Sequence, residues 1–258
     1  MIGRLFGDRQ RRAILRRIDR PAAALLAVSQ GGVAAVAWFV DPVWLAVAVA
    51  VQLALGGIGA VRVLGPARSD LGLARYAMPA SAGLAATLVG RLVPGGISLL
   101  LVPIVVVLLW SVTYLELRVE RGSGGRTIGD LILTAMIFCS GWGLLGLFGP
   151  QAWPTPLTLV GAFALPLAMR AADARGTLGA EGFGQSLLHV LAVVQVGAAT
   201  VLLEIPVYGV AALMALAFYT WAGAVEALRD GASGRAVAIE FGSLLLVGLV
   251  AGLLLHRP

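Results

Sequence analysis

Two short polar stretches of the chain contain residue types that could carry out chemistry. Residues 116–130 read ELRVERGSGGRTIGD, and residues 226–240 read EALRDGASGRAVAIE, so each stretch begins and ends with a carboxylate and contains arginine and glycine. Guanidinium groups and glycine-rich backbone bind phosphate, and carboxylates bind a proton or a metal ion. The candidate polar cluster therefore consists of Glu116, Arg118, Arg126, Asp130, Glu226, Arg229, Arg235 and Glu240.

The same residues also fit a structural role, which is the interpretation that we favour. In a hairpin clamp, a carboxylate at one helix end pairs with an arginine across the turn, and glycines allow the tight reversal. A surface for docking a partner is the third alternative. The alternatives differ in geometry, because a phosphate or metal site requires the four carboxylates to converge around an open groove, whereas clamps remain on their own hairpins.

One part of the second stretch resembles a known family. Residues 230–235, DGASGR, resemble the D-G-x-x-A-R core of the CDP-alcohol phosphotransferases. That family has an aspartate three residues before the core, where this chain has Ala227, and two further aspartates on the following helix, where this chain offers Glu240. Gly234 also replaces the alanine before the arginine. The metal-binding carboxylates are therefore missing, and we assign neither a catalytic residue nor a metal site.

Cysteine and histidine are too few for the common metal and redox centres. Cys139 is the single cysteine, which excludes an internal disulfide and a CxxC motif. His189 and His256 are the two histidines, too few for a bis-histidine haem or a histidine-built zinc centre. We expect no cofactor.

The elements that position these residues follow from composition. Of the 258 residues, 59% are apolar and 12% are charged, and the mean hydropathy is +0.94, values that exclude a soluble domain. Successive apolar runs are long enough to cross about 30 Å of hydrocarbon as helices. We therefore predict an all-α polytopic membrane bundle of nine helices at residues 21–40, 43–63, 76–93, 97–117, 128–149, 157–170, 185–203, 206–226 and 236–256.

The arginines of the connecting links indicate the orientation in the membrane. They are concentrated in alternate links, which predicts a cytoplasmic N-terminus and an external C-terminus in the cell membrane. Residues 1–20 form a basic amphipathic segment with seven arginines, which we expect to bind anionic lipid headgroups. The net charge of +6 thus reflects topology, and we expect no nucleic-acid partner.

The two polar stretches also suggest an internal duplication. At an offset of 110 residues, Glu116 aligns with Glu226 and Asp130 with Glu240. The predicted organisation is a leading transmembrane helix at 21–42, a first four-helix half at 43–149 and a second at 157–256. An even number of helices in each half makes this a parallel 4+4 repeat.

Few polar groups lie at depth in the predicted spans, and Gln52, His189 and Gln195 are the candidates for an intramembrane site. Glu204 is expected to be solvated, with an ion pair to Arg91 as its alternative. The function we favour is a non-enzymatic structural or interaction protein, as a membrane-complex subunit or a homo-oligomer. One alternative is a transporter or channel for a small or amphiphilic solute, with a site between the halves. Another is a lipid-modifying enzyme at the cytoplasmic surface.

Overall fold

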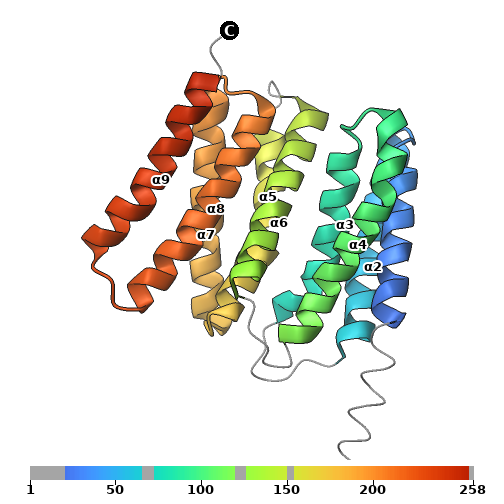
Figure 1. Ribbon diagram of the computed structural model, residues 1–258, viewed down its shortest axis with the longest axis horizontal. Helices are drawn as coiled ribbons and strands as arrows, with labels where there is room; N and C mark the ends of the chain where they lie inside the picture. Colours follow the sequence, from blue (N-terminus) through green and yellow to red (C-terminus); the bar gives the residue numbers. More distant parts are fainter. Residues whose placement is uncertain (1–20, 66–72, 120–125, 150–153, 256–258) are drawn as a thin grey trace, which may run out of the picture.

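A computed structural model describes residues 21–65, 73–119, 126–149 and 154–255, and over these residues the chain is helical and has no strand. Its nine described α-helices confirm the predicted all-α bundle (Figure 1). The predicted amphipathic segment at 1–20 lies outside the described residues. The elements are a leading helix Pro21–Ala37, α2 Pro42–Leu64, the 3-10 helix η1 Leu73–Tyr76, α3 Ala77–Gly90, α4 Gly95–Val119, α5 Arg126–Phe148, α6 Pro154–Ala174, α7 Gly179–Leu202, α8 Val207–Arg229 and α9 Gly234–Leu255.

Seven of the described helices are long and apolar enough to cross a membrane, and the protein is a multi-pass membrane protein. The leading helix and α3 are shorter, and α3 has 14 residues after its 3-10 turn. Helix α6 is longer than the predicted 157–170, because Pro154 and Pro156 stand in its first turn, where a missing N–H costs no helical hydrogen bond. Pro166 lies inside α6 without ending it.

Helix α5 lies at the centre of the bundle and packs against α3, α6 and α8. Figure 1 shows the leading helix and α2–α4 on one side of α5 and α6, and α7–α9 on the other. The apolar core follows this arrangement, since Ile137 and Leu145 of α5 are buried together with Leu167 of α6 and Phe218 of α8. Helices α5 and α6 therefore hold the two sides together, since α6 packs against α3 and α7.

Glycines allow α3 to approach both of its main neighbours closely. A Cβ at Gly56 of α2 would lie 2.3 Å from the Cα of Ala80, and one at Gly143 of α5 would lie 2.6 Å from the Cβ of Leu88. Both distances are shorter than contacts that real side chains make, so a residue with a side chain at either position would push the helices apart. Small residues at such positions are the usual means of close helix packing in membranes.

Helix α9 has a different environment from α5, although the two are equivalent in the predicted repeat. Helix α9 packs mainly against α8 at the edge of the bundle, and most of its surface is exposed. The packing of the two helices therefore differs, and the 4+4 duplication at 43–149 and 157–256 stays a prediction.

Candidate functional site

One end of the bundle, which we call the arginine end, contains a buried ion pair between Glu116 of α4 and Arg170 of α6. The Nε of Arg170 donates to both carboxylate oxygens at 3.0 and 3.1 Å, and its Nη2 donates to Oε2 at 2.9 Å. Both residues are buried, and they are 54 residues apart in the chain. The partner that the structure gives Glu116 thus lies outside its own hairpin, whose arginines Arg118 and Arg126 have side chains outside the described residues. This partner belongs to α6, although α4 packs mainly against α3.

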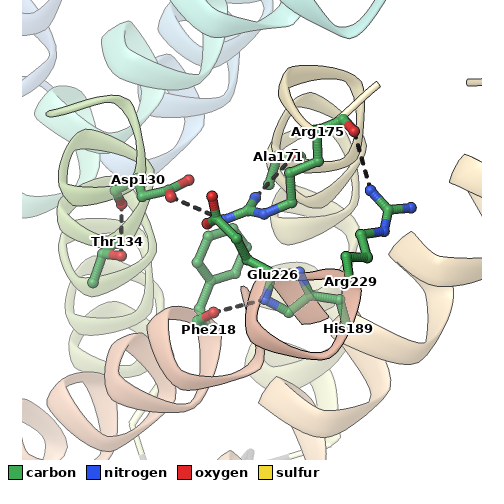
Figure 2. A network of polar contacts seen from close by, with 8 residues as sticks. All are labelled: Asp130, Thr134, Ala171, Arg175, His189, Phe218, Glu226 and Arg229. Atoms are coloured by element: carbon green, nitrogen blue, oxygen red, sulfur yellow. Dashed lines mark hydrogen bonds and ion pairs between the residues drawn. The ribbon is translucent and has the colours of Figure 1, made fainter. Parts of the chain in front are cut away.

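A second group of ion pairs forms around Arg175, in the link between α6 and α7 (Figure 2). Its Nη2 donates to Oδ2 of Asp130 at 2.9 Å and to Oε2 of Glu226 at 3.4 Å, and its Nη1 donates to the Ala171 carbonyl at 2.9 Å. Asp130 lies near the start of α5 and Glu226 near the end of α8. The structure thus brings together one carboxylate from each polar stretch, through an arginine that belongs to neither.

Arg229 attaches the same link to the end of α8. It donates to the carbonyl of Arg175 at 3.1 Å and to Oγ1 of Thr177, and it lies 3.9 Å from the carboxylate of Glu181 on α7. The link can follow this path because Gly176 and Gly179 adopt φ of +77° and +69°, which side chains disfavour. The α6–α7 link is therefore held against α5 and α8 by two arginines.

Two further members of the candidate polar cluster, Arg235 and Glu240, do not join these groups. Glu240 is exposed on α9, and Arg235 is exposed at the start of that helix. The side chains of Arg118 and Arg126 lie outside the described residues. Among the residues that the structure describes, no group of three or more histidine, cysteine, aspartate or glutamate side chains is placed to hold a metal ion.

Arg170 and Arg175 pair with the predicted carboxylates, although neither was predicted as a member of the site. Arg170 ends the predicted span 157–170, and Arg175 lies in the link that follows it. Their role as ion-pair partners could not be predicted, because each carboxylate was expected to pair with an arginine close to it in the sequence. The distance that matters is the one between neighbouring helices.

Gln52 of α2 belongs to a buried hydrogen-bond network. Its Nε2 donates to the carbonyl of Gln30 at 2.8 Å and to Oγ1 of Thr87 at 3.1 Å, and Gln30 donates to the carbonyl of Pro79 at 2.8 Å. The side chains of Gln30, Gln52 and Thr87 are fully buried. This network joins the leading helix, α2 and α3, and its contacts are those of a structural crosslink.

The other two intramembrane candidates lie apart from Gln52 and from each other. His189 of α7 is buried, its Nε2 is 2.9 Å from the Phe218 carbonyl, and its ring stacks on Phe218 with centroids 4.1 Å apart. Gln195 is exposed on the outer surface of α7. Gln52, His189 and Gln195 therefore do not form one site.

An apolar cavity of about 760 Å³, bordered by α2, α3, α5 and α6, could hold a ligand. Helix α3 packs against α2, α5 and α6, so it forms the floor of the cavity between α2 and α6. The residues that line it are apolar except for Ser81 and Arg91. Sequence reasoning did not predict this cavity, because its lining residues are ordinary apolar residues of four spans.

Arg91 lies at the opposite end of the bundle from the arginine end, in the turn after α3. Its Nη1 donates to the carbonyls of Ala37 and Val40 at 2.8 and 2.6 Å, at the end of the leading helix. The alternative pairing of Arg91 with Glu204 is wrong, since Glu204 is exposed in the α7–α8 link and the described residues give Arg91 no ion pair. The expected solvation of Glu204 agrees with its exposure.

Comparison of the chain with protein-family models, with curated proteins and with solved structures found no match in any of the three.

Proposed function

We propose that this protein is a non-catalytic multi-pass membrane protein that holds the apolar chain of an amphiphilic molecule between α2, α3, α5 and α6. The observation that carries the proposal is the cavity of about 760 Å³, whose lining is apolar apart from Ser81 and Arg91. A cavity of this volume is within the range of small-molecule sites in proteins. Its apolar lining suits an alkyl or isoprenoid chain better than a polar solute.

The position of the cavity supports a ligand that comes from the bilayer. It lies over α3 between α2 and α6, two helices that are apolar and long enough to span the membrane. Moving a chain from lipid into this cavity gains little from the hydrophobic effect, because lipid tails are as apolar as the lining. Selection must therefore come from the shape of the cavity and from its polar groups.

The two alternative functions fit the geometry less well. The predicted transport site required Gln52, His189, Gln195 or the matched carboxylates to line a shared cavity, and none of them borders this one. The lipid-modifying enzyme required Glu116, Asp130, Glu226 and Glu240 to converge, whereas Glu116 pairs with Arg170, Asp130 and Glu226 pair with Arg175, and Glu240 is apart on α9. The polar contacts of the arginine end support a role in holding helices together.

Photo-crosslinking in lipid nanodiscs tests the proposal. A hexadecanol probe with a diazirine in its chain should label peptides of α3 and α6 preferentially. Ala162→Trp should reduce this labelling at least fivefold, because Ala162 lines the cavity on the α6 side and the larger ring would fill it. Ala199→Trp is the matched control, since Ala199 is exposed on α7, which does not border the cavity.

Equal labelling of all lipid-facing helices, with no effect of Ala162→Trp, would show that the probe reports the surrounding bilayer and would exclude the proposal. A loss of labelling in Ala162→Trp counts only if that variant keeps the unfolding temperature of the Ala199→Trp control. Ala46→Trp, which fills the cavity from the α2 side, should give the same loss independently.

A further inference from the structure

We infer that the amphiphile carries an anionic headgroup and that this headgroup binds Arg91, with the chain lying along α3. The inference rests on the proposed function and names the class of molecule that the cavity selects. Arg91 is the one charged side chain among the described residues that line the cavity. It stands at the end of α3, whereas the rest of the lining is apolar apart from Ser81.

The guanidinium of Arg91 is fixed in position and keeps donors available. Two hydrogen bonds from Nη1 to the carbonyls of Ala37 and Val40 attach it to the end of the leading helix. The described residues give no hydrogen-bond partner to Nε or Nη2, which together form the edge that binds carboxylate or phosphate in a bidentate manner. A held guanidinium loses little conformational freedom when such an anion binds.

No carboxylate of the described residues neutralises this cation within 4.0 Å. Asp41, next to the cavity residue Pro42, is exposed and makes no ion pair with Arg91. Glu204 is likewise unpaired with Arg91. An unneutralised cation at the edge of an apolar cavity favours an anion over a neutral headgroup.

The depth of Arg91 matches a headgroup. The indole of Trp38 packs against Gly90, the residue before Arg91, and donates to the carbonyl of Ala86 at 3.1 Å, and tryptophan is typical of the membrane–water interface. The cavity runs from Arg91 to Ala77 at the other end of α3, fourteen residues or about 21 Å of helix. This length exceeds the roughly 15 Å of one hydrocarbon leaflet, so it can hold a long chain.

Competition between matched amphiphiles tests the inference in the full chain reconstituted in nanodiscs of neutral lipid. Hexadecyl phosphate and hexadecanol share a chain and differ in charge, and each displaces the diazirine probe from the cavity. Wild type should bind hexadecyl phosphate about 10- to 100-fold more tightly than hexadecanol, the range expected for charge-assisted hydrogen bonds. Arg91→Gln should remove this preference and leave the affinity for hexadecanol within twofold of the wild-type value.

Control variants separate the headgroup from other effects of charge. Arg62→Gln removes an exposed arginine from the other end of α2 and should change neither affinity. Asp41→Asn removes the carboxylate that follows Val40, whose carbonyl binds Arg91, and should strengthen hexadecyl phosphate binding. Arg91→Lys keeps the charge and should keep part of the preference, even if Arg91→Gln lowers the folded yield.

The outcomes distinguish the headgroup inference from the proposed function. Equal binding of both amphiphiles by wild type overturns the inference and leaves the proposed function standing. If Arg91→Gln weakens the binding of both amphiphiles equally, the inference is also overturned, because Arg91 would then stabilise the cavity through its bonds to Ala37 and Val40. If neither hexadecyl phosphate nor hexadecanol displaces the probe from wild type, the proposed function itself is wrong.

Discussion

Arg170 and Glu116 face each other in the interior of the arginine end, with three hydrogen bonds of 2.9–3.1 Å between the guanidinium and the carboxylate. The pair joins α4 to α6 across 54 residues of chain. Both side chains are nearly inaccessible, at 8% exposed for Glu116 and 10% for Arg170. Each charge is therefore compensated mainly by the other.

We expect Glu116→Gln to lower the free energy of unfolding by about 3–5 kcal/mol, because it leaves the Arg170 charge buried without its counter-ion. Arg170→Gln should have a similar effect. The double variant Glu116→Gln/Arg170→Gln should cost less than the sum of the two single variants. Unfolding by SDS in mixed micelles measures all three, and strictly additive losses would contradict a coupled pair.

The two carboxylates at Arg175 should differ in their contributions to stability. Asp130 accepts at 2.9 Å and is 19% exposed, whereas Glu226 accepts at 3.4 Å and is 39% exposed. Asp130→Asn should therefore destabilise the protein more than Glu226→Gln, whose effect should be near the 0–1 kcal/mol of surface ion pairs. Thermal unfolding at low and high salt measures both, and a larger effect of Glu226→Gln would contradict the geometry.

Adjacent glycines of α2 provide a matched test of the contact between α2 and α3. Gly56→Ala should be strongly destabilising, because its Cβ would lie 2.3 Å from the backbone of Ala80. Gly57→Ala should be neutral or stabilising by up to about 1 kcal/mol, since a Cβ at Gly57 meets nothing within 4 Å and alanine favours helix. Thermal unfolding of the two variants should separate them clearly, and equal midpoints would exclude the close approach.

The buried amide network of Gln52 should contribute to the free energy of unfolding, whereas the exposed amide of Gln195 should not. Gln52→Leu removes two hydrogen bonds and should cost about 0.6–2 kcal/mol for each. Gln195→Leu replaces an exposed amide on α7 and should have no cost in lipid. The comparison uses unfolding free energies in the same micelles. A larger loss in Gln195→Leu would show that α7 has a partner on that face.

The orientation in the membrane remains a prediction and can be measured with single cysteines. In a Cys139→Ala background, Ser233→Cys places a thiol between α8 and α9, and Glu204→Cys places one between α7 and α8. With the arginine end in the cytoplasm, an impermeant maleimide added to intact cells should label Glu204→Cys alone. Labelling of Ser233→Cys alone would reverse the orientation.

Much of the fold could be predicted because each membrane span is indicated by the apolar residues of its own segment. A membrane span needs a run of apolar residues of a certain length, and its intrahelical hydrogen bonds close within the run. Helices α4, α5, α7, α8 and α9 therefore appear close to their predicted positions, within six residues at each end. The largest boundary error is at the start of α7, predicted at residue 185 and found at Gly179, because the polar and glycine-rich residues 179–184 hid the helix; the next largest is at the end of α6.

The candidate site could be predicted only in part. The sequence correctly singled out Glu116, Asp130 and Glu226 as charges that need partners at the membrane edge, because an isolated carboxylate there is costly. The identity of those partners depends on which helices are neighbours, and apolar lipid-facing helices contain little information about this. Arg170 and Arg175 consequently became visible as partners only in the folded bundle.

The sequence by itself determined that this is a helical membrane protein, which residues form its spans and which few charges need compensation. These properties depend on the free energy of each segment in lipid, so they can be predicted from one amino-acid sequence. The tertiary structure decided that α5 is central, that Arg175 joins Asp130 to Glu226, and that a cavity ends at Arg91. These properties depend on contacts between helices far apart in sequence, whose packing is set by the shapes of all the side chains together.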